Sequence, residues 1–454
     1  MADAYGWGRQ RNIPGVGTSF GPSLAAWNGR LYAAWKGINN DQGIYWASFD
    51  GNAWGPQHNI PGVGTSTGPS LCFFNGLLYA AWKGINNDQG IYWSFYDGNA
   101  WAPQRNIPGV GTSLIPSLAV FQGRLYAMWK GINNDQGLYF SSTDGNTWTP
   151  QRNIPGVGSS THASLAVFQN RLYAAWKGIN NDKGIYWSSF DGSNWASQRN
   201  IGGVGTSFGP SLTVYQNFQN QTLLYAVWKG INNDQGIYFS SFDGNNWAAQ
   251  QNIANVGTSV GAAIAPFGNL LYAAWKGEDS DQGIYWTLFF DLSAFNTSFN
   301  FSMQSQTQTN WCWSAVSVST SKFYNSASAW TQCSLANQQL GQTTCCQNGS
   351  TTGCNQAWYL DRALTETGNL DAWQSGTVSQ QILEGEIVRR LPVGIRIGWS
   401  GGGGHFVIVD GATTSNSTVH VEDPIYGTSD IAYSTLASSY QGSGSWTHTY
   451  FTRA

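Results

Sequence analysis

The chain has 454 residues, more than one hydrophobic core usually holds, and this length predicts at least two domains. Charged residues make up 10% of it, against about 25% in an ordinary soluble domain, whereas aromatic residues reach 15%. The net charge of −3 and the lack of a Lys/Arg cluster exclude the electrostatic footprint of a nucleic-acid-binding protein, so no nucleic acid is expected as a partner.

The N-terminal residues, Met1 to Trp7, have neither the basic nor the apolar region of a signal peptide. No run of about 18 apolar residues follows, so no membrane span is expected. Five of the six cysteines, however, lie between Cys312 and Cys354, and disulfides among them would require an oxidising compartment. These conflicting signals leave two settings: action outside the cell after non-conventional release, or storage in the cytoplasm.

An internal repeat runs through the first part of the chain. The string Asn-Ile-Pro-Gly-Val-Gly recurs with small changes, and so does Trp-Lys-Gly. Both series step by 47 residues except for one step of 52, and they give six units. The Trp-Lys-Gly strings begin at Trp35, Trp82, Trp129, Trp176, Trp228 and Trp275.

Each unit has the pattern of short β-strands separated by turns. Leu31–Trp35 and Ile44–Phe49 are aromatic-rich runs of strand length, and Asp50–Trp54 supplies the Asp-Gly pair of a hairpin turn. Four such strands in roughly 47 residues are typical of one propeller blade.

The two ends of the repeat complement each other. Trp7 lies 47 residues before Trp54, so the N-terminal segment is the tail of a unit without a head. The sixth copy runs through Ile284–Phe289 and then lacks its own Asp-Gly hairpin. A strand from the N-terminus added to this copy would close the ring and remove both free sheet edges. The sequence therefore predicts an all-β six-bladed propeller over residues 1–291.

The repeats resemble the propeller lectins of the tectonin and fucose-binding type, in blade length, in the Trp-Lys-Gly element and in the aromatic strand that follows it. The resemblance implies binding of glycans that carry fucose, galactose or N-acetyl sugars. Sugars need flat aromatic faces for their C–H patches and amides or carboxylates for their hydroxyls, and the loop Ile38–Gln42 lies beside aromatic residues. The expected carbohydrate-binding residues are Trp35, Asn40, Asp41, Tyr45, Trp46, Trp82, Asp88, Trp93, Trp129, Asp135, Trp176, Asp182, Trp187, Trp228 and Asp234.

Each of these features also has a plain structural explanation. Packing between blades explains a repeated Trp, and recent duplication explains the repeated Asn-Asn-Asp-Gln loop. Lys183 replaces Gln in the fourth copy, and the sixth copy has changed to the string Glu278–Gln282, which is expected to weaken its site. Several weak sites on one rigid ring would act through avidity.

After Asp291 the period ends, and residues 292–454 form a second domain. The segment Trp313–Ser321 contains Ala, Val and Ser without Gly or Pro, which predicts a helix with Cys312 at its N-terminus. The helix dipole favours a thiolate there, and the thiolate is the nucleophilic form of cysteine.

A cysteine nucleophile needs a base, which is usually distant in sequence. His420 and His448 alternate within strand-like segments and have the pattern of surface residues. His405 follows Gly401–Gly404 and precedes an apolar strand. Glycines let a substrate backbone approach and leave the imidazole open at the mouth of the strand, so His405 is the expected base.

Two further groups complete the expected site. Asp423 lies 18 residues after His405, and a hairpin return would bring it beside the ring to orient the imidazole. Gln306 precedes Cys312 by six residues and is the expected oxyanion donor, with Gln304 and Gln308 as rivals.

In this order, Gln306, Cys312-Trp, Gly-His405-Phe and Asp423-Pro-x-Tyr-Gly, the residues resemble the short papain-like cysteine peptidases of bacteria and fungi over about 160 residues. The resemblance implies an α+β domain in which Cys312 attacks a carbonyl and His405 moves the proton. It also implies that Asp423 orients the ring and that Gln306 stabilises the oxyanion. Asp stands where papain has Asn, and the domain is shorter than papain, which leaves its substrate subsites unpredicted.

The other cysteines of this domain, Cys333, Cys345, Cys346 and Cys354, allow two disulfides in three pairings, although adjacent cysteines rarely bond each other. A zinc site made of four thiolates is the alternative, but the spacing fits a zinc knuckle poorly. The sequence shows no phosphate loop, paired acids or metal motif elsewhere, so neither a cofactor nor a metal is expected.

These patterns together predict a chimaeric lectin whose propeller holds a cysteine peptidase, a hydrolase of peptide or protein substrates, at glycosylated surfaces, in defence or as a toxin. Two alternatives remain. The first is a lectin with a catalytically inert second domain. The second is an acyl transferase or deamidase that uses the same Cys, His and Asp.

Overall fold

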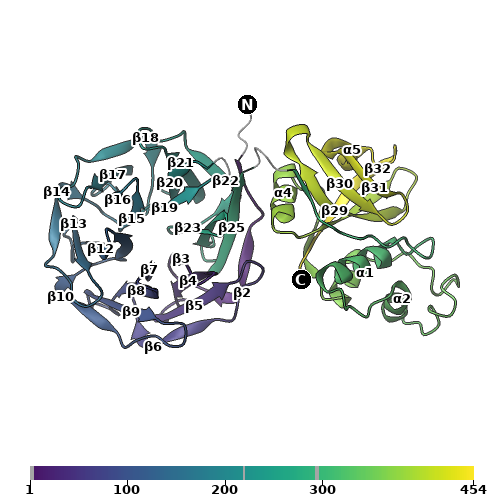
Figure 1. Ribbon diagram of the computed structural model, residues 1–454, viewed down its shortest axis with the longest axis horizontal. Coiled ribbons are helices and arrows are strands. Elements are labelled where there is room, and N and C mark those ends of the chain that lie inside the picture. The colour runs from purple at the N-terminus through teal and green to yellow at the C-terminus, as the bar shows by residue number, and fades with distance from the viewer. Residues whose placement is uncertain (1–4, 218–219, 292–295) are drawn as a thin grey trace. The chain divides into compact units, whose positions relative to one another are not determined.

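The computed structural model describes residues 5–217, 220–291 and 296–454. The chain divides into two compact units: Gln10–Phe289, and Phe290–Ala454 together with Met1–Arg9. Figure 1 shows the first unit as a ring of strands and the second as a mixture of helices and strands.

The first unit is a six-bladed β-propeller in which each blade is an antiparallel sheet of strands consecutive in sequence. The first three blades consist of β3 (Ser23–Trp27), β4 (Arg30–Lys36), β5 (Gly43–Phe49) and β6 (His58–Gly64); β7 (Ser70–Phe74), β8 (Leu77–Lys83), β9 (Gly90–Tyr96) and β10 (Arg105–Gly111); and β11 (Ser117–Phe121), β12 (Arg124–Lys130), β13 (Gly137–Thr143) and β14 (Arg152–Gly158). The next two consist of β15 (Ala163–Phe168), β16 (Arg171–Lys177), β17 (Gly184–Phe190) and β18 (Arg199–Gly205); and β19 (Ser211–Gln216), β20 (Thr222–Lys229), β21 (Gly236–Phe242) and β22 (Gln251–Gly257).

The sixth blade closes the ring with strands from both ends of the repeat. It contains β23 (Ala263–Phe267), β24 (Leu270–Lys276) and β25 (Gly283–Asp291), to which the N-terminal strand β2 (Arg11–Gly17) is added. Arg11 lies opposite Trp286 in this pairing. The predicted number of blades and the predicted closure are both confirmed.

The propeller unit is shorter at both ends than the expected range of residues 1–291, because it begins at Gln10 and ends at Phe289. β1 (Tyr5–Trp7) also pairs with β25, but the segment up to Arg9 belongs to the second unit. There Arg9 forms an ion pair with Asp371, and its guanidinium lies 4.0 Å from the centre of the Phe451 ring.

The Asp-Gly hairpins form as expected, because each Asp fixes its own turn. Asp50 Oδ1 accepts hydrogen bonds from the backbone amides of Asn52 and Ala53. Gly51 has a φ of 106°, which strongly favours glycine.

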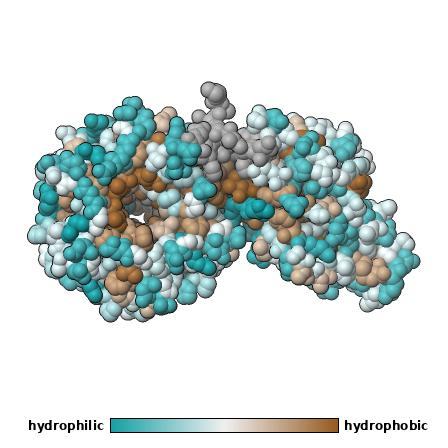
Figure 2. All heavy atoms as spheres, in the orientation of Figure 1, coloured by the Kyte–Doolittle hydropathy of each residue, from teal (hydrophilic) through white to brown (hydrophobic). Residues whose placement is uncertain are grey.

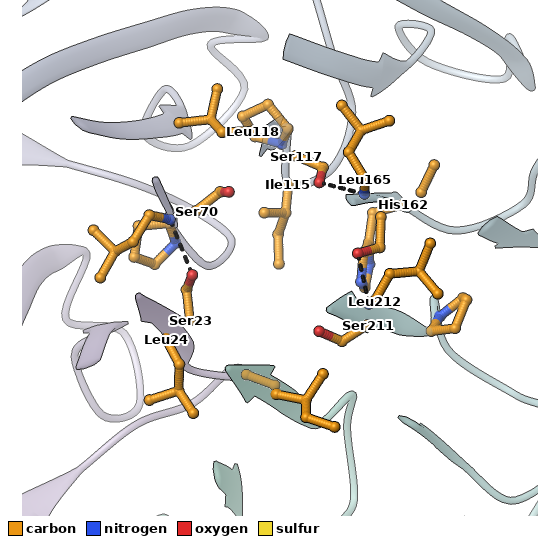
Figure 3. A pocket seen from close by; sticks show the side chains of 18 of the residues that line it. Ser23, Leu24, Ser70, Ile115, Ser117, Leu118, His162, Leu165, Ser211 and Leu212 are labelled. Atoms are coloured by element: carbon orange, nitrogen blue, oxygen red, sulfur yellow. Dashed lines mark hydrogen bonds between the residues drawn. The ribbon is translucent and has the colours of Figure 1, made fainter. Parts of the chain in front are cut away.

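The innermost strands surround a central channel, which is visible as an opening in Figure 2 and from close by in Figure 3. The cavity measures about 120 Å³ and is lined once per blade by variants of the string Pro-Ser-Leu. Ser23 Oγ accepts a hydrogen bond from the Leu71 amide of the next blade at 3.0 Å. His162 stands in a position that is glycine in four other copies, and burial lowers its pKa to about 4, so a neutral imidazole lines the channel.

The second unit combines helices with one antiparallel sheet in the strand order β27-β32-β28-β29-β30-β31, with β26 paired to β29. Its helices are α1 (Cys312–Tyr324), α2 (Gln332–Leu340), α3 (Leu360–Glu366), α4 (Gln380–Val388) and α5 (Tyr433–Ser438). Its strands are β26 (Asn296–Ser298), β27 (Leu370–Ser375), β28 (Val393–Trp399), β29 (Gly404–Thr413), β30 (Thr418–Asp423), β31 (Gly427–Ala432) and β32 (Gly444–Thr452), with a short 3-10 helix at Thr414–Asn416. None of the described helices is long and apolar enough to cross a membrane.

Two disulfides hold the region around α2. They join Cys333 to Cys346 and Cys345 to Cys354, so the alternative of a four-thiolate zinc site is wrong. Cys312 is free. The core beneath it contains Trp313 and Phe406, which connects α1 to β29.

Candidate active site

Cys312 is the first residue of α1, as the sequence predicts. The preceding residue, Trp311, makes no side-chain hydrogen bond to cap the helix. Amides in the first turn of a helix have no partner within it, and the dipole favours negative charge at this end. The Cys312 sulfur therefore lies at the end of α1 where backbone amides have no partner within the helix.

Cys312 lines a cleft of about 180 Å³ in the second unit. The sulfur-bearing side chain is 8% exposed. Many of the other residues that line the cleft are aromatic. The lining residues are Thr309, Asn310, Cys312, Trp313, Ala357, Trp358, Trp399, Gly404, His405, Phe406, Ile425 and Tyr426.

His405 reaches the same cleft from β29, but the glycines before it act differently from the expectation. Gly402 and Gly403 have φ values of 91° and 84° in the turn that leads into β29. At Gly404 a Cβ atom would lie 2.7 Å from the Arg396 guanidinium. The expectation that they leave the imidazole open is wrong, because His405 is only 3% exposed.

The aromatic ring of Trp399 covers one face of this imidazole. The two rings are nearly parallel, with centroids 6.1 Å apart, and Tyr426 meets the imidazole edge-on. Exclusion of water strengthens the electrostatic interactions of the imidazole with its partners.

The structure brings Cys312, His405 and Asp423 together. His405 Nε2 lies 2.9 Å from Asp423 Oδ1, and Cys312 lines the same cleft as the imidazole. The β29–β30 hairpin accounts for the approach of His405 and Asp423, as their spacing of 18 residues predicts.

Asp423 is held by several donors besides the imidazole. Its Oδ1 accepts from the amides of Ile425 and Tyr426 at 2.7 and 2.9 Å, and its Oδ2 accepts from the Tyr440 hydroxyl at 2.7 Å. Burial raises the pKa of Asp423, but the hydrogen bond from His405 and these amides outweigh it and lower the pKa below its usual value. The carboxylate is therefore charged and fixed in orientation. No sequence pattern predicts the contact with Tyr440, since this tyrosine lies 17 residues away from Asp423 in a separate segment.

The charge state of His405 follows from the same contacts. Burial lowers the pKa of His405, but the hydrogen bond to Asp423 and the interactions with Asp423 and Cys312 raise it to about 9. The ring is thus protonated at neutral pH. An imidazolium beside a sulfur is the condition in which cysteine nucleophiles exist as thiolates.

Gln306 lies in the loop before α1 and is not among the residues that line the cleft. Its Nε2 donates to the carbonyl oxygens of Gln308 and Thr309, both at 2.9 Å. Both amide hydrogens are thereby engaged, so donation to an oxyanion requires the side chain to rotate. The oxyanion role of Gln306 stays a prediction.

In the propeller, the tryptophans expected to bind sugar are buried between blades. The Trp of each Trp-Lys-Gly string is 0% exposed and shares a core with the neighbouring blade. The assignment to sugar binding is therefore wrong for Trp35, Trp82, Trp129, Trp176 and Trp228.

Three more of the expected sugar-binding residues, Trp46, Trp93 and Trp187, lie in the strand that follows the Trp-Lys-Gly string. Each is 9% exposed or less and lies under a cation or an imidazole of its own blade. His58 stacks on Trp46 with centroids 4.7 Å apart, and Arg105 lies 5.3 Å from the centre of Trp93. Arg199 covers Trp187 in the same way. Their faces are not available to a ligand, which corrects the assignment of Trp46, Trp93 and Trp187.

The Asn-Asn-Asp-Gln loop has a structural task in every blade that keeps it. Asp41 Oδ1 accepts from the Gly43 amide, and its Oδ2 accepts from the Tyr45 hydroxyl at 2.9 Å. Gln42 Nε2 donates to Asn86 Oδ1 of the next blade at 2.6 Å, and Gln42 Oε1 accepts from the backbone amide of Asn86 at 2.8 Å. We call this reciprocal amide pair the blade clasp.

The same Asp bonds recur at Asp88, Asp135, Asp182 and Asp234. The clasp recurs as Gln89–Asn133, Gln136–Asn180, Gln235–Asp279 and Gln282–Asn39. Asn40 is exposed and lies beside these bonds. The loop is therefore explained by ring architecture, and sugar binding is not needed to account for its repetition.

A groove that the sequence analysis missed lies between the third and fourth blades. It is lined by Tyr139, Gln151, Arg152, Asn153, Pro155, Ser193, Asn194 and Trp195. Arg152 extends across it, 5.2 Å from the centre of the Phe140 ring, and donates to the carbonyl oxygen of Ser193 at 3.3 Å. The basic residue that opens most Asn-Ile-Pro-Gly strings was the available signal, since it recurs at Arg11, His58, Arg105 and Arg199.

Comparison with known proteins yields distant structural likeness only. A scan against models of known protein families finds no match, and a search of curated proteins finds no similar sequence. Among solved structures, AofleA from Arthrobotrys oligospora is 13% identical with a TM-score of 0.48, over 63% of this chain and 86% of its own. A lectin from Aleuria aurantia in complex with Fucα1-6GlcNAc is 12% identical with a TM-score of 0.44, over 60% and 96%. An intramolecular trans-sialidase from Ruminococcus gnavus is 11% identical with a TM-score of 0.47, over 60% and 94%.

Proposed function

We propose that the second unit is a papain-like cysteine peptidase with Cys312 as nucleophile. The observation that carries this proposal is that the free Cys312 and His405 line one cleft, and that His405 is hydrogen-bonded to Asp423. A buried free cysteine, a protonated imidazole and a fixed carboxylate are the three parts that covalent acyl transfer requires.

The reaction follows from the charge states of these groups. The Cys312 thiolate attacks the carbonyl carbon of the substrate, and the oxyanion develops beside the free backbone amides at the start of α1. Protonated His405 then gives its proton to the leaving amine, and a thioester remains on Cys312. Neutral His405 next takes a proton from water, whose oxygen attacks the thioester carbonyl; the acid product leaves, and the thiolate of Cys312 and the protonated His405 are restored.

Asp423 contributes through His405 and not through the substrate. Its bond to Nε2 leaves the other ring nitrogen directed at the sulfur, and its charge stabilises the imidazolium. The bonds from Tyr440 and the two backbone amides fix the carboxylate in this orientation.

The cleft favours a substrate with an apolar side chain. Trp358 and Trp399 line it, and Ile425 and Tyr426 beside them are 53% and 54% exposed. Apolar surface of this kind gains free energy when a ligand covers it. Peptides with aromatic or large aliphatic residues next to the cleaved bond are therefore the expected substrates.

Active-site labelling tests the proposal directly. The intact chain is treated under native conditions with an epoxide or iodoacetamide probe, and the modified peptide is identified by mass spectrometry. We expect one label at Cys312, slower labelling in His405→Ala, and none at this position in Cys312→Ala. Unmodified Cys312 in the folded wild-type chain would contradict any enzymatic role. Product analysis with an added amine then separates hydrolysis from acyl transfer, the alternative activity of the same triad.

We further propose that the propeller binds glycans, in the groove between the third and fourth blades. Exposed Arg152 and Asn153 offer hydrogen-bond donors beside the half-buried rings of Tyr139 and Trp195, the combination that sugar recognition needs. A glycan array with fucosylated, galactosylated and N-acetylated glycans tests this function. Binding by the wild-type chain that is lost in Trp195→Ala would support it, and silence across the array would favour a protein-binding scaffold. With both functions, the chain is a lectin that brings a peptidase to glycosylated surfaces.

A further inference from the structure

A second cluster of ionisable side chains lies on the β29–β30 hairpin, outside the cleft. Asp410, His420 and Glu422 each present one potential ligand atom, and these atoms lie within 4.8 Å of one another. His420 Nε2 is 3.7 Å from Glu422 Oε1 and 4.0 Å from Asp410 Oδ1. The proposed peptidase mechanism uses none of the three.

A β-bulge contributes to this convergence. Val409 pairs with Val421, but Gly411 pairs with His420, so Asp410 is an extra residue in β29. Bulges re-aim a side chain that regular alternation would direct elsewhere. His420 and Glu422 are two residues apart on β30 and share one face of the sheet.

Asp410 is the residue that most needs a partner. It is 0% exposed, and within the described part of the chain neither of its carboxylate oxygens has a hydrogen-bond partner. A buried carboxylate without hydrogen bonds is strongly unfavourable, because no water replaces the lost solvation. A cation between Asp410 and its neighbours would satisfy both oxygens.

The other two side chains are already oriented as ligands. His420 Nδ1 lies 2.7 Å from Asp430 Oδ1, so Nδ1 faces outward and Nε2 faces the two buried carboxylates. A carboxylate behind the histidine is the usual arrangement at metal sites, where it fixes the tautomer and the ring. Thr428 likewise donates to Glu422 Oε1 at 3.2 Å and holds that carboxylate.

We propose that Asp410, His420 and Glu422 form a binding site for a divalent transition-metal ion, with Asp430 as the group that orients His420. An imidazole with two carboxylates suits Zn²⁺ or Mn²⁺, whereas Ca²⁺ and Mg²⁺ prefer oxygen ligands alone. Zinc bonds of about 2.0–2.2 Å put tetrahedral ligand atoms roughly 3.3–3.6 Å apart. The distances of 3.7 and 4.0 Å to the imidazole need to shorten by a few tenths of an ångström, and the two carboxylates, within 4.8 Å of each other, need to approach by about 1 Å. The sequence pattern predicts no metal, so this site was not expected from the sequence.

The ion would have a structural role in the second unit. It joins β29 to β30, and these strands also carry His405 and Asp423. Metal binding would therefore stabilise the hairpin that presents the base and its orienting carboxylate.

The experiment uses the full chain as Cys312→Ala, because the thiol and imidazole of the cleft could bind Zn²⁺ themselves. The protein is treated with a chelator, dialysed, and titrated with Zn²⁺ and with Mn²⁺ by calorimetry, and bound metal is counted by mass spectrometry. We expect one ion per chain. In this background Asp410→Asn and His420→Ala should each weaken binding at least tenfold, while His448→Ala, on β32 of the same sheet, should leave the affinity unchanged. No stoichiometric binding, or equal binding in Asp410→Asn, would overturn the proposal in favour of a protonated His420 held among carboxylates.

A second measurement avoids dependence on variants that fail to fold. Co²⁺ added to the folded Cys312→Ala chain should give a spectrum of nitrogen and oxygen ligands without a thiolate charge-transfer band. Asp430→Asn keeps all three ligands and removes only the orienting group, so it should fold and lose about 10- to 100-fold in affinity. A thiolate band, or full affinity in Asp430→Asn, would count against this ligand set.

Discussion

The two units use their polar residues in opposite ways. In the propeller the repeated polar residues hold the architecture: Lys36, for example, is 6% exposed and donates to the carbonyl oxygens of Asn39 and Asp41 at 3.1 and 2.8 Å. In the second unit, Cys312 and His405 belong to no repeat, and both line one cleft. The repeated loop residues therefore hold the scaffold of the propeller, whereas the proposed catalytic residues belong to no repeat.

The largest effect is expected where a single-copy residue is removed. Cys312→Ala should lower peptide hydrolysis by at least about 10³-fold, because the nucleophile has no substitute. Asp423→Asn should also reduce the rate strongly, since it removes the charge that stabilises the His405 imidazolium. The matched change in the scaffold is Asp41→Asn, which should leave hydrolysis unchanged. Rates measured with a fluorogenic peptide library check these outcomes, and equal losses in Asp423→Asn and Asp41→Asn would erase the contrast between the units.

Next in size is the effect of a scaffold tryptophan on stability. Trp228→Ala empties a fully buried position between blades and should lower the free energy of unfolding by about 3–5 kcal/mol. Trp195→Ala, at a half-buried position in the groove, should cost less stability and abolish glycan retention. Denaturant unfolding and glycan binding, measured on both variants, separate the two roles. If Trp228→Ala lost glycan binding at full stability, the division between scaffold and groove would be wrong.

Much of this fold was open to prediction from the repeat itself. The 47-residue period gave the number of blades, and the missing hairpin after Phe289 gave the closure by β2. The order Cys312, His405, Asp423 predicted which side chains converge in the second unit, through the resemblance to papain-like peptidases. The sequence could not show which face of a strand each Trp presents, so Trp35 was assigned to sugar binding when it is buried between blades.

The unpredicted parts depend on contacts between distant segments. The blade clasp joins residues 44 apart, and its partners are common amides with no distinctive pattern. The bulge at Asp410 changes the direction of one side chain without a Gly or Pro at that position to announce it. Tyr440 reaches Asp423 through the packing of β30 against the segment after α5, which no local pattern encodes.

A titration distinguishes the units through two histidines of opposite behaviour. The pKa of His405 is raised from 6.5 to about 9 by Asp423 and Cys312 against the effect of burial, so its contribution to stability is complete below pH 6.5 and is lost as the pH rises through 9. The pKa of His162 is lowered from 6.5 to about 4 by burial, so its contribution is present above pH 6.5 and is lost as the pH falls through 4. Each loss should be on the order of 1–3 kcal/mol. Calorimetry of His405→Gln and His162→Gln between about pH 4 and 10 should show the difference from wild type shrinking at the alkaline end for the first and at the acid end for the second. The same pH dependence in both variants would contradict these assignments.

The smallest expected effect concerns the blade interface at which, among the described residues, Lys replaces the Gln of the clasp. Gln136 pairs with Asn180 through both amide atoms at 2.7 and 2.8 Å, but Lys183 stands where the next clasp would begin, opposite Asn232. The charge of Lys183 also lowers the pKa of Lys177 and Lys229, the last residues of β16 and β20, in addition to the larger effect of burial.

Lys183→Gln should therefore raise the free energy of unfolding by about 0.5–1.5 kcal/mol, because it adds a reciprocal amide pair and removes a repulsion. Urea unfolding of the propeller measures the gain. Asn232→Ala is the matched control: it should cost little in the wild type and should cancel most of the gain in Lys183→Gln, since the two changes share one interaction. If Asn232→Ala costs the same in both backgrounds, any gain comes from relief of charge alone, and the Asn-Asn-Asp-Gln loop would need a reason for its repetition other than the closure of neighbouring blades.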